Sequence, residues 1–216
     1  TAYNDEEWVE YNLASILNQT YSNYHVMYYD DASSDNTYQK VLDIVKDNPK
    51  FNINTRKENK GALFSYVECL KQVNDEDIIV CVSGDDWLFD ENVLKNLNSF
   101  YNKTDVWMTY GKFYCWDGKS NNVVEANPQN TPHSDLVHKY KLYKKDLWRA
   151  SHLRTFKGFL LKKLSLQTYK SKLDNQFFDH AADLAISFPC LELCGKEKIG
   201  VIDFPTYVYN TSETQQ

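Results

Sequence analysis

Residues 78–88 read IIVCVSGDDWL, and this stretch decides the fold. Its apolar part shows no alternation with polar side chains, which is typical of a strand buried on both faces of a parallel sheet. Gly84 permits a close approach between backbone and ligand, and Asp85 and Asp86 follow it directly. Two adjacent like charges cost free energy unless a cation or a hydrogen-bonding ligand relieves their repulsion. We therefore expect a ligand at the carboxyl end of this strand, where open parallel sheets bind ligands.

A second pair of aspartates, Asp30 and Asp31, follows another short apolar run, residues 26–29. An aspartate at a strand end accepts hydrogen bonds from a nucleobase or from ribose hydroxyls. Hard carboxylate oxygens also suit Mg²⁺ or Mn²⁺, which take few protein ligands together with phosphate oxygens. The two pairs together predict one site for a nucleotide and a divalent metal. The alternative is local: each pair could cap a helix or bond to the backbone of a turn.

Up to about residue 111, short apolar runs alternate regularly with helical patterns. This order predicts an α/β fold, with a mostly parallel, Rossmann-like sheet flanked by helices. Beyond it a stretch rich in tryptophan and tyrosine comes first, and helical patterns return near residues 160–166 and 177–186. We expect residues 1–110 to form a nucleotide- and metal-binding lobe. Residues 111–216 should form a mixed α+β lobe of the same continuous domain.

The composition argues against several classes of protein. The 216 residues carry a formal net charge of −6 and no long block of lysine and arginine, so nucleic acid and anionic membranes are not expected as main partners. No apolar run reaches transmembrane length, and no signal-peptide pattern is found. The five cysteines are scattered and odd in number, which favours reduced thiols and a soluble, cytoplasmic setting.

Four motifs resemble, in order and spacing, the nucleotide-binding half of glycosyltransferase family 2. They are residues 1–4 (TAYN), 30–35 (DDASSD), 59–61 (NKG) and 83–88 (SGDDWL). The resemblance covers roughly the first 110 residues. It implies the glycosyltransferase A fold, an inverting reaction, a nucleotide-diphosphate sugar donor and a divalent cofactor, Mn²⁺ or Mg²⁺.

The sequence departs from the family's pattern in three ways. Ser83 stands where the family often has aspartate, and Ala32 where glycine is more frequent. The strand expected before the Thr1 motif is not in this sequence. The first departure leaves the metal site resting on Asp86 alone, with phosphate and water.

The resemblance also implies roles for single residues in the first lobe. Thr1, Tyr3 and Asp31 would face the base and ribose, and Asp85 would lie near the ribose or donor sugar. Asp86 would hold the metal that bridges the diphosphate. Asn59 and Gly61, from the third motif, complete the expected donor site.

The second lobe, expected to bind the acceptor, must supply a base. An inverting transfer needs a carboxylate that removes the proton from the acceptor hydroxyl as it attacks the anomeric carbon. Asp179 and Asp183 are four residues apart on a predicted helix and therefore share one face. The segment from Asp183 to Gly195 resembles the family's acceptor-site segment, which favours Asp183 as the base and leaves Asp179 as an acceptor-binding candidate. A solvated helix carboxylate is the alternative for both.

A further candidate group precedes that helix. His152 and Arg154 could neutralise charge on the departing diphosphate or touch the acceptor. Trp148 could form a face on which a sugar ring stacks. The alternatives are a structural histidine and a core aromatic side chain.

These expectations describe a metal-dependent, inverting glycosyltransferase that moves a sugar from a UDP-linked donor to a hydroxyl of a glycan, lipid or protein. Two alternatives stay open. A nucleotidyltransferase of similar fold is disfavoured because no Gly- and Arg-rich phosphate loop is seen. A non-catalytic nucleotide- or sugar-binding module is kept open by Ser83.

Overall fold

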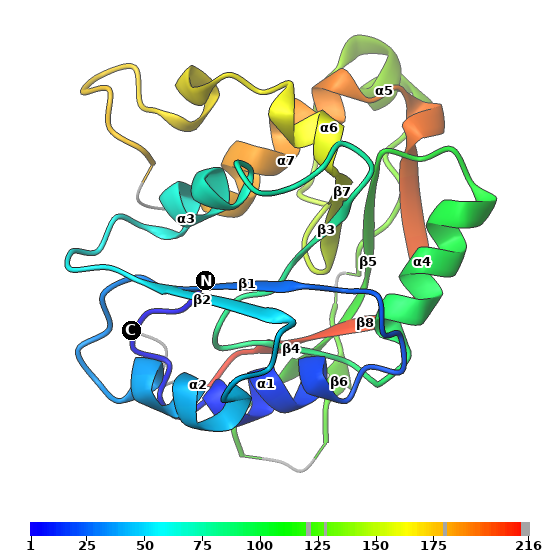
Figure 1. Ribbon diagram of the computed structural model, residues 1–216. Helices are drawn as coiled ribbons and strands as arrows, with labels where there is room; N and C mark the ends of the chain where they lie inside the picture. The colour runs from blue at the N-terminus through cyan, green and yellow to red at the C-terminus, as the bar shows by residue number, and fades with distance from the viewer. Residues whose placement is uncertain (120–121, 128, 179–180, 213–216) are drawn as a thin grey trace.

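The computed structural model describes residues 1–119, 122–127, 129–178 and 181–212, and its strands form two sheets (Figure 1). In the smaller sheet, β1 (Val26–Asp30) and β2 (Phe51–Thr55) pair in parallel. The strands of the larger sheet follow the order β3 (Ile78–Cys81), β7 (Arg154–Lys157), β5 (Met108–Trp116), β8 (Ile199–Asn210) and β4 (Trp87–Leu88), and β6 (Val124–Glu125) pairs with β5.

Helices cover both sides of these strands. In Figure 1, α1 and α2 lie below β1 and β2, whereas α3 and α7 lie above them. The α-helices are α1 (Val9–Leu17), α2 (Thr37–Val45), α3 (Ala62–Cys69), α4 (Val93–Lys103), α5 (Asp135–Tyr140), α6 (Gly158–Lys162) and α7 (Ala182–Leu193). Three short 3₁₀ helices span Tyr143–Lys145, Leu166–Tyr169 and Lys196–Lys198. Among the described residues, no helix is both long and apolar enough to cross a bilayer.

The expected α/β class is confirmed, but the larger sheet is mixed. Strand β7 runs antiparallel to both β3 and β5, whereas β5 and β8 pair in parallel. The sequence analysis named no strand at residues 154–157, which form β7. Strand β5 crosses residue 110, the expected boundary between the lobes. In the sheet, β7 lies between β3 and β5, and β8 lies between β5 and β4, so strands of the two expected lobes share one sheet.

The apolar stripe of α1 builds the core under β1. Val9 and Leu13 are fully buried and pack with Val41 and Val45 of α2 and with Tyr28 of β1. Side chains at positions i, i+3 and i+4 lie on one face of a helix. Burial of this stripe therefore fixes the rotation of α1 about its own axis. As a result, the beginning of α1 is held beside the carboxyl end of β1.

His152, which precedes β7, is held in an aromatic stack against β8. Its ring centroid lies 4.9 Å from that of Tyr207 and 4.7 Å from that of Tyr209, with both pairs of rings close to parallel. Burial and the nearby charge of Arg154 lower the pKa of His152 to about 3. The folded protein therefore keeps this ring neutral, because charging it would require solvating a buried cation.

Removing buried volume from the core should destabilise the protein strongly. Leu160 of α6 is fully buried, and Leu160→Ala should lower the free energy of unfolding by about 2–5 kcal/mol, because it leaves a cavity. Leu173 is 98% exposed, and Leu173→Ala should change it by less than about 0.5 kcal/mol. Urea unfolding measures both, and equal losses would contradict this description of the core.

The stability of the protein should fall in acid through His152. Its folded-state pKa is depressed, so between pH 6.5 and pH 3 the unfolded chain binds a proton that the folded chain does not. This group alone should remove about 2 kcal/mol of unfolding free energy between pH 7 and pH 5. His152→Phe should reduce the pH dependence by that amount in urea titrations. Identical pH slopes for the two proteins would show that His152 titrates normally.

Candidate active site

The acidic ends of β1 and β3 are joined through the first residues of the chain. Ala2 donates its backbone N–H to the Tyr29 carbonyl and accepts from the Asp31 N–H, both at 2.9 Å. The Thr1 nitrogen lies 3.5 Å from the Val82 carbonyl oxygen. The residues that follow the two strands therefore lie at one edge of the molecule.

Asp31 holds the loop that precedes α3. Its Oδ1 accepts from the Lys60 N–H at 3.0 Å, and its Oδ2 accepts from the Gly61 N–H at 2.6 Å. Gly61 has a φ of +81°, which glycine adopts without strain, and its N–H also lies 3.0 Å from the side-chain oxygen of Asn59. Asp31 thus positions Asn59 and Gly61, two of the residues expected to bind the donor.

Arg56 completes this loop and was missed by the sequence analysis, which saw only a polar connection. Its Nη1 donates to Asp31 Oδ1 at 3.0 Å, and its guanidinium lies over the rings of Tyr29 and Phe64. The other terminal nitrogen, Nη2, is buried without a hydrogen-bond partner among the described residues. A buried guanidinium donor of this kind is expected to receive an acceptor from a ligand.

Asp30 has the local role that the sequence analysis kept as its alternative. Its Oδ2 accepts from the Ser33 N–H at 3.2 Å and from the Thr55 hydroxyl at 3.0 Å. These bonds close the turn after β1 and tie it to β2. Asp30 therefore holds the turn after β1, whereas Asp31 holds the loop of residues 56–61.

Asp86 is enclosed by β8. It is 1% exposed, and the Tyr207 hydroxyl and the Asn210 N–H each donate to one of its carboxylate oxygens at 2.8 Å. Burial, with the charge of Asp85, raises the pKa of Asp86. Each oxygen thus accepts one hydrogen bond and keeps a second lone pair, so Asp86 as a metal ligand stays a prediction. Tyr207 and Asn210 lie more than 120 residues away in sequence, and nothing local in the sequence predicts them.

Asp85 is half-buried, and a second carboxylate, Asp5, lies next to it. Burial, followed by the charge of Asp85, raises the pKa of Asp5 to about 7. Burial also raises the pKa of Asp85. A Cβ atom on Gly84 would lie 2.3 Å from Asp5 Oδ2, so only glycine allows this approach. The sequence analysis left Asp5 out because it read as the acidic first turn of a helix.

The pair formed by Asp5 and Asp85 fits a shared cation. Among the residues that the structure describes, no group of three or more His, Cys, Asp and Glu side chains is arranged to hold a metal ion. However, burial is the main cause that raises the pKa values of Asp5 and Asp85, so the charged form of each carboxylate lacks part of its hydration. Mg²⁺ and Mn²⁺ bind in such places through one or two carboxylates, and phosphate oxygens supply further ligands.

Arg154 connects this edge to the beginning of α7. It is 7% exposed, and its Nη1 donates to the Ser151 carbonyl at 3.1 Å and lies 3.7 Å from Asp183 Oδ2. Because β7 pairs with β3, Arg154 stands opposite Cys81, close to the residues that follow β3. Asp183, whose side chain is one-third exposed, is thereby held next to the acidic strand ends.

Tyr209 shows how close these carboxylates are to one another. Burial raises its pKa, and the charges of three aspartates raise it further. These aspartates are Asp86, Asp85 and Asp183. The end of β3 and the beginning of α7 therefore both contribute negative charge near the Tyr209 hydroxyl.

The remaining predicted site residues lie elsewhere or are not described. The Trp148 ring packs edge-on against Phe188 of α7, with 5.2 Å between the ring centroids. This contact supports the alternative role of Trp148 as a core aromatic side chain. The faces of the His152 ring are covered by tyrosines, as described above. Tyr3 is 50% exposed next to Asp5. Asp179 lies outside the described residues.

Several known glycosyltransferases are similar to this chain in sequence or in structure. Over 136 residues the chain is 31% identical to UDP-Glc:alpha-D-GlcNAc-diphosphoundecaprenol beta-1,3-glucosyltransferase WfgD of Escherichia coli, covering 63% of this chain and 52% of that protein. The chain thus spans about half the length of the curated relatives it matches.

Two solved structures share the fold. TarS 1–349 of S. aureus in complex with UDP-GlcNAc superposes with a TM-score of 0.70 at 18% identity, over 99% of this chain and 58% of that chain. The mannosyltransferase PcManGT of Pyrobaculum calidifontis, in complex with GDP-Man and Mn²⁺, gives 0.62 at 17% identity, over 99% and 56%. The expected glycosyltransferase A fold is therefore confirmed.

The family model described as Glycosyl transferase family 2 matches residues 1–169, which include β1 to β7 and the four motifs of the first lobe but not the segment from Asp183 to Gly195. The chain belongs to glycosyl transferase family 2.

Proposed function

We propose that this chain carries the catalytic centre of a metal-dependent, inverting glycosyltransferase that uses a UDP-sugar. The observation that carries the proposal is the position of Arg154, which stands opposite Cys81 at the end of β3 and lies 3.7 Å from Asp183 of α7, so that the acidic end of β3 and the candidate base share one edge. Negative groups at one place suit a cation bound with a diphosphate, and a separate carboxylate suits a base. WfgD, by its name, uses UDP-Glc, and TarS was solved with UDP-GlcNAc, which favours UDP over GDP.

The donor nucleotide would bind at the loop that Asp31 and Arg56 hold. The unpartnered Arg56 Nη2 can donate to a carbonyl of the base, while Asn59 and Gly61 form the neighbouring wall. Tyr3, half-exposed at the same edge, offers a ring for contact with the nucleoside.

Asp85 would be the direct metal ligand, which revises the expectation for Asp86. Asp5 lies close enough to Asp85 for the two negative charges to interact, so both can attract the same cation. Asp86 accepts a hydrogen bond from Tyr207 and so anchors β8 next to this pair. When bound, the cation neutralises charge on the diphosphate that leaves. Arg154 would add positive charge on the same side as the bond between sugar and phosphate breaks.

Asp183 would remove the proton from the acceptor hydroxyl. It lies in the first turn of α7, and its Oδ2 lies 3.7 Å from the Arg154 guanidinium, which holds the carboxylate at this edge. The acceptor oxygen then attacks the anomeric carbon from the face opposite the nucleotide, which inverts its configuration. WfgD by its name acts on a sugar linked to diphosphoundecaprenol, so a lipid-linked saccharide is the first acceptor to test.

Replacing the base should abolish transfer without affecting donor binding. Asp183→Asn should lower the turnover number by roughly 10²–10⁴, because general base catalysis contributes that much. Glu192→Gln is the matched control: it lies on the same helix and pairs only with the surface residue Lys144 among the described residues. Transfer is measured as UDP release with the acceptor present, and UDP affinity by calorimetry. Full activity of Asp183→Asn, with normal UDP affinity, would remove Asp183 from this role.

UDP binding should depend on the cation through Asp85. Mn²⁺ should tighten UDP binding at least about tenfold, which corresponds to 1.4 kcal/mol, and Asp85→Asn should remove that gain. The exposed Asp47 provides a control, since Asp47→Asn takes away the same charge far from this edge. Equal UDP affinity with and without Mn²⁺ in the unsubstituted protein would refute metal dependence. Binding of UDP without any hydrolysis or transfer would favour a non-catalytic module.

A further inference from the structure

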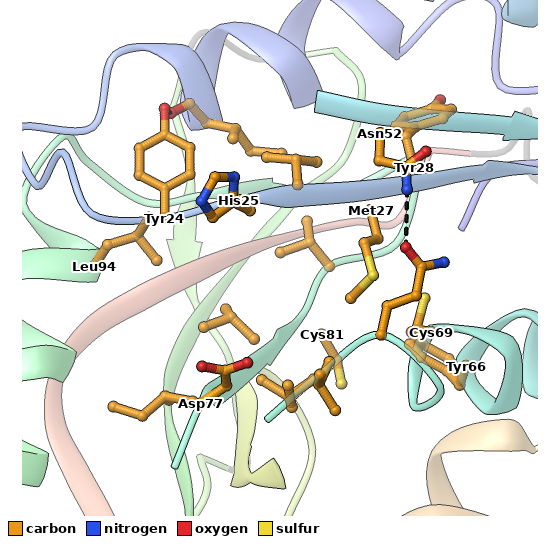
Figure 2. A pocket seen from close by; sticks show the side chains of 18 of the residues that line it. Tyr24, His25, Met27, Tyr28, Asn52, Tyr66, Cys69, Asp77, Cys81 and Leu94 are labelled. Atoms are coloured by element: carbon orange, nitrogen blue, oxygen red, sulfur yellow. Dashed lines mark hydrogen bonds between the residues drawn. The ribbon is translucent and has the colours of Figure 1, made fainter. Parts of the chain in front are cut away.

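Apolar side chains lie on the surface of α5 and of the segment that follows it. Leu136 is 65% exposed, Tyr140 is 59% exposed and Leu147 is 71% exposed. They differ from the apolar side chains around the cavity of about 740 Å³ between β1 and β3, where Met27 and Cys81 lie on opposite walls (Figure 2). That cavity is bounded by the chain itself, whereas the side chains at α5 face solvent. Exposed apolar side chains that lie together mark a surface that binds a partner.

Helix α5 presents these side chains because another face of it is anchored in the core. Val137 is buried in the largest apolar cluster of the molecule. Leu136, Lys139 and Tyr140 occupy positions i, i+3 and i+4, so they share a face that Val137 does not occupy. The Lys139 ammonium lies over the Tyr140 ring, 5.1 Å from its centroid. The exposed face of α5 therefore combines apolar and positively charged side chains.

The charge of the chain is divided unevenly, which its net value of −6 conceals. Residues 136–172 contain eleven of the 24 lysines and arginines and a single acidic residue, Asp146. The other residues carry thirteen basic and 29 acidic side chains. The sequence analysis set anionic membranes aside because of the net charge and the lack of a continuous basic block. A partner meets only the charges of the surface that it contacts, so the local excess decides.

Several lysines surround the exposed apolar side chains. Lys139, Lys141 and Lys145 are exposed, and within the described part of the chain none of them forms an ion pair with a carboxylate. Lys144 does, since its Nζ lies 3.1 Å from a carboxylate oxygen of Glu192 in the last turn of α7. In Figure 1, α5 lies at the top of the molecule, whereas α1 and α2 lie at the bottom. Three positive charges thus remain without a neutralising partner at this edge.

We propose that α5 and residues 141–147, here called the α5 surface, dock the chain onto a membrane with anionic headgroups. The leucines and the Tyr140 ring enter the boundary between headgroups and acyl chains, and the lysine ammonium groups stay with the lipid phosphates. A nucleic acid would pair with the lysines but would leave the leucines in water, so the exposed apolar side chains favour lipid. The inference stands independently of the chemistry proposed for the acidic edge.

Vesicle sedimentation tests the charged part of this surface. The probes are vesicles of phosphatidylcholine alone and of phosphatidylcholine mixed equally with phosphatidylglycerol, each at low and high salt. The charge variant is Lys139→Gln/Lys141→Gln, and its matched control is Lys46→Gln/Lys95→Gln. Each variant joins one lysine of a helix to one in the left-handed region at a helix end, with a φ of +51° at Lys141 and +48° at Lys46. Both therefore remove the same charge from similar local structure.

Two further variants test the apolar part. Leu136→Ser removes an exposed leucine from α5, and Val124→Ser is its control, because Val124 of β6 is exposed to the same extent, 66%. Urea unfolding shows that each variant folds. Competition with duplex DNA of random sequence tests for a nucleic acid, and light scattering tests for association between copies of the chain.

The chain should bind the mixed vesicles at least about tenfold more tightly than the neutral ones, and high salt should weaken that binding. The charge variant should lose about tenfold or more, because each lysine near an anionic surface strengthens binding about fivefold. Leu136→Ser should weaken binding about threefold or more, since it removes apolar side chain from the lipid boundary. Both controls should bind as the unsubstituted chain does.

Four results would overturn the proposal. The first is no binding to the mixed vesicles, and the second is an equal loss in the charge variant and its control. The third is unchanged binding of Leu136→Ser, because the leucine would then not reach the lipid. The fourth is a preference for another partner through the same lysines. Displacement from the mixed vesicles by equimolar duplex DNA would assign the surface to nucleic acid, and a dimer that only the charge variant loses would assign it to a second copy.

Discussion

Several carboxylates share one poorly solvated edge of the sheet, and their mutual repulsion governs the site. Asp5 and Asp85 face each other across Gly84, and Asp86 lies behind them against β8. Burial raises the pKa of all three, because the charged form of each carboxylate loses hydration there. The positive charge of Arg154 lowers the pKa of Asp86, and the same guanidinium lies 3.7 Å from Asp183. A bound cation with a diphosphate would relieve the repulsion that remains.

The fold creates this edge by bringing together segments that are distant in sequence. Strand β7 carries Arg154 to the side of β3, and the end of β8 places Tyr207 and Asn210 around Asp86. The first residues of the chain tie β1 to β3 at the same level. The residues expected to bind the donor and those expected to bind the acceptor are therefore held by the same strand ends.

Patterns within short windows were enough to predict the α/β class and the acidic strand ends. The unbroken apolar run before Gly84 and the helical stripe of α1 both follow from burial, which local composition records. The sequence could not show that Tyr207 and Asn210 would enclose Asp86, since strand pairing over more than 120 residues leaves no local signal. Asp5 was missed for another reason. An acidic residue at the start of a helix is common, and only the close approach of Gly84 shows that Asp5 also lies at the acidic edge. Arg56 was hidden in a polar loop whose conformation depends on Asp31.

The account depends on a cation meeting the carboxylate of Asp85 at the end of β3. Anomalous diffraction from crystals grown with UDP and Mn²⁺ tests this most directly. The account predicts a manganese peak at about 2.0–2.2 Å from an Asp85 oxygen, with diphosphate oxygens among the other ligands. Bound UDP with no manganese at this edge, or manganese held by Asp86 in place of its bonds to Tyr207 and Asn210, would contradict it.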